Sequence, residues 1–206
     1  MVKYTLHYFD ARGRGECARL LLAYGEEDFV DKRYTQEEFK EAKKSMPFGQ
    51  VPVLEVDGKM LPQSFTINRY LARKYGLAGK DDFEQATVDA IGDSVMDFFN
   101  EFREWFLVAH GFAPGDKDKI FKEKYVPAAE KYFPIIKKYI KDAGNGYLVK
   151  GGPTWVDFHF AEFFDTLNNL IPDFYKTYPE FKKLSEQVHA LPKLQKYLNA
   201  RSKLEF

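Results

Sequence analysis

The chain has 206 residues, with 31 basic and 31 acidic side chains, so its formal net charge at pH 7 is zero. That balance gives no electrostatic reason to expect a nucleic acid or an anionic membrane as a partner. The length allows a substantial core, in one large or two small domains. Cys17 is the only cysteine, which excludes an intramolecular disulfide.

Targeting and membrane signals are not apparent in the sequence. No run approaches the length of a membrane span, and the N-terminus lacks the apolar region of a signal peptide. We therefore expect a cytoplasmic protein. Aromatic residues make up 17% of the chain and are frequent in its second half, where we expect them to line a cavity for apolar ligands.

The first part of the chain alternates short strands and helices. Hydrophobic patterns predict strands at 3–9, 29–34, 53–56 and around Met60, and helices at 15–24, 36–44 and 65–75. A βαβ half followed by a ββα half is the order of a thioredoxin-like domain.

Residues 76–82 interrupt this pattern and are interpreted as a linker. Beyond them every strong hydrophobic periodicity is that of a helix, and helices are predicted at 83–109, 117–142, 154–170, 178–190 and from 192 onward. We therefore predict an α/β plus all-α chain. A thioredoxin-like domain of residues 1–79 is followed by an all-helical domain of residues 80–206.

The segment from Pro47 to Gly58 carries a binding signal. Val53 to Val56 is predicted as a strand, and Asp57-Gly58 is a hairpin turn signal. Pro52 stands at the mouth of that strand, where a proline often marks a cis bond. Such a bond would turn the N–H and C=O of Val51 outward, free to bind an extended peptide.

Gln63-Ser64 then opens a helix, for which Ser64 is the predicted N-cap. The unpaired N–H groups of a helix start can hold an anion. A backbone clamp beside a carboxylate seat suits a small acidic peptide.

Redox chemistry is the first function that a thioredoxin-like order suggests. A thiol oxidoreductase needs a cysteine at the start of the first helix. This chain has Gly13-Arg14-Gly15 there, and Cys17 is interpreted as a small buried helix residue. Tyr8 ends the preceding strand, and on pattern alone it is an ordinary half-buried aromatic.

Together, Tyr8-Phe9, the run from Arg12 to Gly15, Lys43, and the segment from Pro47 to Ser64 resemble the glutathione S-transferases. The resemblance spans the chain from Tyr4 to the last helices. Within the family it points to the sigma class, which includes nematode enzymes and the vertebrate haematopoietic prostaglandin D synthases. It implies an enzyme that conjugates the glutathione thiolate to hydrophobic electrophiles.

The resemblance assigns catalysis to Tyr8, whose hydroxyl would donate a hydrogen bond to the glutathione sulfur, and to Arg14, whose charge would assist. A thiol of pKa near 8.5 is only about 3% ionised at pH 7, and lowering that pKa by about two units corresponds to roughly 2.7 kcal/mol. Nucleophilicity falls by roughly 6–10-fold at the same time. Much of the acceleration must therefore come from holding the electrophile beside the sulfur.

The same resemblance assigns the other glutathione contacts. Gln50 and Val51, next to Gly49 and Pro52, would clamp the cysteinyl backbone. Gln63 and Ser64 would bind the γ-glutamyl end, and Lys43 the glycyl carboxylate. Phe39 lies where sigma-class relatives usually carry a tryptophan, so we expect the loss of one hydrogen-bond donor and somewhat weaker binding.

A ladder of like charges occupies the helix at 83–109, with acidic residues at every fourth position: Asp89, Asp93, Asp97 and Glu101. Such spacing destabilises an isolated helix, so a compensating partner is expected. The resemblance implies a two-fold homodimer in which the ladder meets Arg69 and Arg73, and Asp97 reaches the neighbour's glutathione. A solvated acidic face and a divalent-cation site are the alternatives. Phe48 would either insert into the partner or fill the local core.

The remaining motifs are assigned as follows. Thr154 and Asp157 match a capping box, a folding element. The four histidines share no metal-ligand spacing, and no metal is predicted. His159 is expected in the electrophile pocket, with the further lining residues Phe9, Phe99 and Arg103.

Two other kinds of function stay open. The aromatic cavity would serve a carrier of haem or other hydrophobic ligands, and a structural relative would keep the fold without activity. Among enzymes, the alternative is glutathione-dependent isomerisation of prostaglandin H2 to D2.

Overall fold

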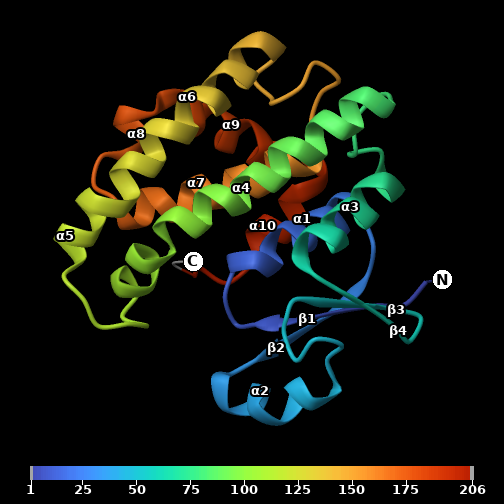
Figure 1. Cartoon of the computed structure of the whole chain (residues 1–206). Helices are drawn as coiled ribbons and strands as arrows, with labels where there is room; N and C mark the ends of the chain where they lie inside the picture. The colour runs from blue at the N-terminus through green and yellow to red at the C-terminus, as the bar shows by residue number, and fades with distance from the viewer. Residues whose placement is uncertain (1, 205–206) are drawn as a thin grey trace.

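The computed structural model describes residues 2–204 and contains a mixed four-stranded sheet of order β2-β1-β3-β4 (Figure 1). The strands are β1 (Tyr4–Phe9), β2 (Phe29–Tyr34), β3 (Val53–Val56) and β4 (Lys59–Pro62). The β1–β2 pair is parallel, and the β1–β3 and β3–β4 pairs are antiparallel. This is the predicted thioredoxin-like arrangement.

Helices cover both faces of the sheet. Helices α1 (Glu16–Tyr24) and α3 (Ser64–Tyr75) lie between the sheet and the rest of the molecule, whereas α2 (Gln36–Ala42) lies on the opposite face (Figure 1). Single helical turns precede α1 at Gly13–Gly15 (η1) and follow α2 at Lys43–Ser45 (η2). The turn η1 therefore connects the C-terminal end of β1 to the start of α1.

The second half of the chain is helical, as predicted. Its elements are α4 (Asp82–Ala109), α5 (Lys117–Ile120), η3 (Phe121–Tyr125), α6 (Val126–Ala143), α7 (Trp155–Leu170), α8 (Phe174–Thr177), α9 (Pro179–His189), η4 (Pro192–Leu194) and α10 (Gln195–Ala200). One continuous apolar core joins these helices to α1, α3 and the sheet. No helix among residues 2–204 has the length and hydropathy that crossing a bilayer requires.

Helix α7 connects the two halves. Trp155, at its start, is fully buried and meets the Phe65 ring of α3 with centroids 5.3 Å apart. Its carbonyl accepts a 3.5 Å hydrogen bond from the Cys17 thiol of α1. The predicted capping box is confirmed, because the Thr154 N–H donates to Oδ2 of the buried Asp157 at 2.7 Å. The start of α7 is thereby fixed against both α1 and α3.

Three local predictions were wrong. Ser64 is the first residue of α3 and not its N-cap, which is Gln63, with a positive φ of 74° and no capping hydrogen bond from its side chain. The predicted helix at 117–142 is interrupted by the wide π-type turn η3, just before Pro127, which has no N–H to donate. The short helix α8 was not predicted, because four residues are too few for a hydrophobic period.

Candidate active site

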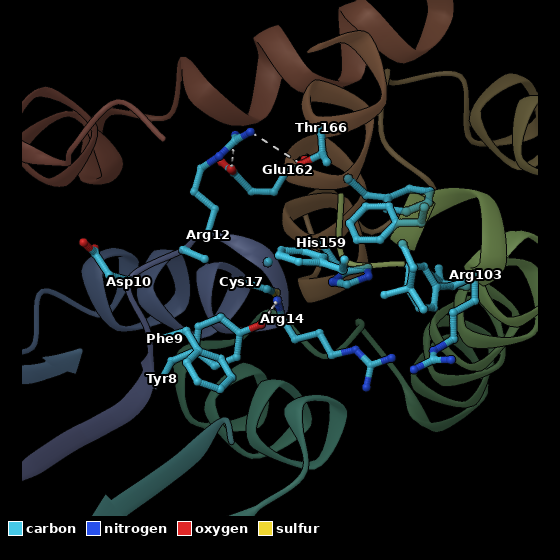
Figure 2. Close-up of a pocket in the computed structure, with 18 of the residues that line it drawn as sticks. Tyr8, Phe9, Asp10, Arg12, Arg14, Cys17, Arg103, His159, Glu162 and Thr166 are labelled. Carbon is cyan, nitrogen blue, oxygen red and sulfur yellow. Dashed lines mark hydrogen bonds and ion pairs between the residues drawn. The ribbon is translucent and has the colours of Figure 1, made fainter. Parts of the chain in front are cut away.

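Tyr8 lies at the end of β1 with its side chain buried under the turn η1 (Figure 2). The Arg14 N–H donates a 2.9 Å hydrogen bond to the Tyr8 hydroxyl oxygen. The glycines of that turn make the approach possible, since a Cβ on Gly15 would stand 2.6 Å from Cδ1 of Tyr8. Because its oxygen already accepts the Arg14 N–H, the hydroxyl proton can be donated to another group.

The protonation of Tyr8 follows from its surroundings. Burial raises its pKa, and the Arg14 N–H together with the positive charges of Arg14 and Arg19 opposes that rise only in part. The net pKa is above the ordinary value, so Tyr8 is a neutral phenol at pH 7. It can act as a hydrogen-bond donor there, but not as a phenolate base.

A small polar cleft adjoins Tyr8. We define the polar cleft by its lining residues Arg14, Phe48, Gln50, Val51, Pro52, Pro62, Gln63 and Ser64. The Val51-Pro52 bond is cis, as predicted, and the backbone N–H and C=O of Val51 form no hydrogen bond within residues 2–204. The first N–H groups of α3 open beside it. The backbone clamp and the helix start that were predicted from one segment therefore line one cleft.

Four further predicted glutathione residues do not line the polar cleft. Phe39 packs its ring edge on Phe9 with centroids 5.0 Å apart, and Lys43 is exposed in η2. Gly49 lies between two lining residues, with a φ of 59° and its N–H bonded to the Met46 carbonyl at 2.9 Å. Asp97 is exposed on α4 and lies in neither hollow of the same chain.

A larger apolar cavity of about 690 Å³ lies on the other side of Arg14. The predicted residues Phe9, Phe99, Arg103 and His159 all line it, together with Tyr8 and Arg14. Figure 2 shows the side chains of Tyr8 and Phe9 from β1, Arg14 from η1, Arg103 from α4 and His159 from α7 converging on this cavity. Since Arg14 lines both hollows and Tyr8 reaches the cavity, a molecule in the polar cleft and one in the apolar cavity would meet at these two residues.

His159 contributes an uncharged ring to the apolar cavity. Its ring stands edge-on to Phe65 at 5.0 Å and stacks on Phe163 at 6.4 Å. Burial, with a smaller contribution from the charge of Arg14, lowers the pKa of His159 to about 4. At pH 7 it is therefore neutral.

One buried polar cluster in the wall of the apolar cavity was not predicted. The Arg12 guanidinium donates to Glu162 at 2.9 Å (Figure 2). Glu162 also pairs with His189 and Arg201, each at 2.8 Å. Burial alone would raise the pKa of Glu162, but these partners lower it to about 2. The sequence did offer one signal for this cluster, because Glu162 lies within the aromatic run from Phe158 to Phe164, where a carboxylate is buried only if it is paired.

Cys17 has no redox role in this arrangement. Its thiol is 1% exposed and bonded to a carbonyl, and burial raises its pKa well above the ordinary value. The interpretation of Cys17 as a buried helix residue is confirmed. Among residues 2–204, no group of three or more His, Cys, Asp or Glu side chains is arranged to hold a metal ion.

Family comparisons agree with this geometry. The glutathione S-transferase N-terminal domain matches residues 4–73, and the C-terminal domain matches residues 96–201. The chain is 42% identical to Glutathione S-transferase 1 of Ascaris suum over 206 residues, which cover 100% of both chains. It is 40% identical to Probable glutathione S-transferase 9 of Caenorhabditis elegans, with 98% of each covered. The chain belongs to the glutathione S-transferase family.

As a glutathione transferase, the protein uses glutathione as co-substrate and acts on hydrophobic electrophiles. Its fold is similar to that of NaGST1, with a TM-score of 0.96 and 43% identity over 100% of both chains. A Nu-class transferase from Haemonchus contortus has a TM-score of 0.90 and 45% identity over 100% of both chains. Prostaglandin synthase D of Nilaparvata lugens has a TM-score of 0.87 and 34% identity, and the match covers 98% of this chain and 100% of that one. The similar structures thus carry different class names within the family.

Three of the four acidic residues of the ladder, Asp89, Asp93 and Glu101, are paired within one chain. Arg69 of α3 donates to Asp89 at 2.8 Å and to Asp93 at 2.5 Å, and Glu101 pairs with Lys131 at 2.5 Å. The ladder was predicted to meet Arg69 and Arg73 across a two-fold dimer. Arg69 pairs with Asp89 and Asp93 of its own chain, so this part of the compensation needs no partner subunit.

Two features of the same region remain open to a partner. Asp97 and Arg73 are exposed and have no ion-pair partner among residues 2–204. Phe48 is 65% exposed, so it does not fill the local core. One similar structure, Na-GST-3 of Necator americanus, is a monomer. It has a TM-score of 0.93 and 41% identity, and the match covers 99% of this chain and 100% of that one.

Proposed function

We propose that this glutathione transferase activates its co-substrate through Tyr8 and Arg14, with the sulfur at the junction of the polar cleft and the apolar cavity. The observation that supports this proposal is the hydrogen bond from the Arg14 N–H to the Tyr8 oxygen, because an oxygen that already accepts leaves its hydroxyl proton available for donation to a sulfur. The raised pKa of Tyr8 supports a donor role at neutral pH. Positive charge from the Arg14 side chain favours the thiolate.

The remaining glutathione contacts are proposed in the polar cleft and at its rim. The free backbone of Val51 would pair with the cysteinyl backbone, next to Gln50, Gly49 and Pro52. Gln63 and Ser64 at the start of α3 would hold the γ-glutamyl carboxylate, since the first N–H groups of a helix favour an anion.

The glycyl end of glutathione is proposed to lie toward α2. The exposed Lys43 would pair there with the glycyl carboxylate. Phe39 would supply a wall without a hydrogen-bond donor, while its ring packs on Phe9. Phe9, Phe99, Arg103 and His159 would form the seat of the hydrophobic electrophile, because all four line the apolar cavity that Tyr8 reaches.

We further propose a sigma-type enzyme of cytoplasmic detoxification that works as a two-fold dimer, with the domain boundary between residues 79 and 80. The dimer is supported by the exposed ring of Phe48 at the rim of the polar cleft and by the exposed, unpaired Asp97 and Arg73. In such a dimer Asp97 would reach the glutathione of the other subunit.

The Tyr8→Phe variant tests the proposed chemistry. Removing the hydroxyl should raise the kinetic pKa of bound glutathione by about one to two units and lower turnover at pH 7 at least a few-fold. Binding of S-hexylglutathione, which has no thiol, should stay within about twofold. The measurement is conjugation of 1-chloro-2,4-dinitrobenzene between pH 5.5 and 9. A variant with the wild-type pH profile would rule Tyr8 out.

A further inference from the structure

Two positive charges of the apolar cavity have no counter-ion in the protein. Arg14 and Arg103 both line the cavity, and neither guanidinium forms an ion pair or hydrogen bond within residues 2–204. The other charged lining groups are satisfied, since Arg12 pairs with Glu162 at 2.9 Å and Asp10 with Arg33 at 2.8 Å. The neutral His159 adds no further charge.

The two guanidinium groups lie along one wall. The Arg14 guanidinium stacks over the Phe99 ring at 5.4 Å, and Arg103 follows Phe99 by four residues on the same face of α4. Four residues correspond to a rise of about 6 Å along the helix. Figure 2 shows the two side chains extending from η1 and α4 toward the same side of the cavity. Arg103 therefore lies one helical turn along α4 from the ring that Arg14 covers.

Because they lie at different places, the two arginines can have different roles. Arg14 also lines the polar cleft and stands next to Tyr8, where the glutathione sulfur is proposed to lie. Arg103 does not line the polar cleft; it lies at the exposed rim of the apolar cavity, where the second substrate is proposed to bind. An unpaired guanidinium beside an aromatic wall favours a planar anionic group attached to an apolar body, because it can donate two parallel hydrogen bonds to that group.

We propose that Arg103 selects electrophiles that carry an anionic group, a carboxylate or a sulfonate, on a hydrophobic body. This inference rests on the proposed function, in that the apolar cavity is taken as the electrophile seat. In such a complex the reactive carbon lies at Tyr8 and Arg14, the body packs on Phe99, and the anion lies one turn along α4. Arg103 is a specificity residue in this scheme and takes no part in the bond-forming step.

A binding experiment tests the anion seat without catalysis. The probes are 8-anilinonaphthalene-1-sulfonate and its uncharged counterpart N-phenyl-1-naphthylamine, titrated by fluorescence with the wild-type protein and Arg103→Gln. The variant should bind the sulfonate about 3- to 10-fold more weakly, the size expected for one partly solvated charged hydrogen bond, and the neutral probe within about twofold. Arg103→Lys should recover part of the loss. Lys141→Gln, at an exposed lysine of α6 that lies outside the cavity lining, controls for net charge and should leave both probes unchanged.

A matched pair of substrates then connects the seat to turnover. Ethacrynic acid and its methyl ester share one electrophilic enone, and only the acid carries a carboxylate. Arg103→Gln should lower the acid-to-ester ratio of kcat/KM about 3- to 10-fold, and 0.5 M salt should narrow the ratio of the wild type. Equal loss on both probes or both substrates, or no loss on either, would overturn the proposal. A wild-type protein that binds the sulfonate through Arg103 but conjugates neither substrate would overturn the selection of electrophiles by Arg103, whereas the role of Tyr8 is tested separately by Tyr8→Phe.

Discussion

The polar cleft takes its whole lining from residues between Arg14 and Ser64, whereas the apolar cavity is lined by residues from Tyr8 to Thr166. Most of the polar cleft comes from one short segment around a cis proline, a hairpin and a helix start. The apolar cavity needs β1, η1, α4 and α7 together. Recognition of the shared co-substrate is thus encoded locally, while the seat of the variable substrate depends on the packing of two halves of the chain.

The first and largest expected effect comes from a substitution in the wall of the apolar cavity. Glu162→Gln leaves the buried Arg12 and the half-buried Arg201 against a neutral amide, and we expect a loss of about 3 kcal/mol in the free energy of unfolding. Urea denaturation at pH 7 measures it, with the exposed Glu104→Gln as control.

The pH dependence of that difference provides a second check. The folded-state pKa of Glu162, about 2, is below its unfolded value near 4.3, so its contribution to stability is complete above the unfolded pKa. The stability gap between the wild type and Glu162→Gln should therefore shrink as the pH falls from about 4.3 toward 2. A gap independent of pH across that window would contradict the assigned role.

The second prediction concerns Tyr8, at the junction of the polar cleft and the apolar cavity. In Gly15→Ala the new Cβ would stand 2.6 Å from the Tyr8 ring and must displace it. A displacement of this kind near the reacting atoms can cost about 100-fold in kcat/KM. Gly58→Ala, at a hairpin glycine with a φ of 81° and open space around it, should lose stability without losing activity. If both variants lose activity in proportion to stability, the contact with Tyr8 is not responsible.

The third prediction sharpens the account of the polar cleft. Ser64→Ala removes a hydroxyl at the start of α3, and the KM for glutathione should rise about 5- to 10-fold with little change in kcat. The reason is that the contact exists before and during the reaction alike. Thr66→Ala, two residues along the same helix, exposed and outside the cleft, should leave both constants unchanged. A change confined to kcat for Ser64→Ala would argue against a binding role.

The smallest expected effect concerns the contact between α3 and α4. Arg69→Gln should lower the free energy of unfolding by about 1 kcal/mol or less, because the carboxylates of Asp89 and Asp93 are largely solvated. A double-mutant cycle with Asp89→Asn measures the coupling within the chain. Arg73→Gln, which breaks no ion pair within residues 2–204, is the matched variant. Dissociation of a dimer by Arg69→Gln alone, seen in sedimentation, would show that Arg69 also acts between subunits.

Local patterns in the sequence were sufficient for much of this molecule. Strand β2 and strand β3 lie within their predicted bounds, the turn at Asp57-Gly58 has two positive φ values, and Thr154 and Asp157 form the predicted cap. These features depend on interactions over a few residues, namely side-chain alternation, the φ of a turn and a capping hydrogen bond. The polar cleft was predictable for the same reason, since its parts are neighbours in the chain.

Other features were decided only when distant segments came together. Arg12 gives no sign in the sequence that it is buried against Glu162, and the ladder on α4 does not reveal that Arg69 of the same chain compensates it. The sequence by itself determined the order of elements, the backbone geometry beside Pro52 and the types of residue available for binding. The tertiary structure decided which charges neutralise one another and which, like Arg103, remain free to face a ligand. The physical reason is that ion pairing and burial depend on distances through space, which the spacing of residues along the chain does not specify.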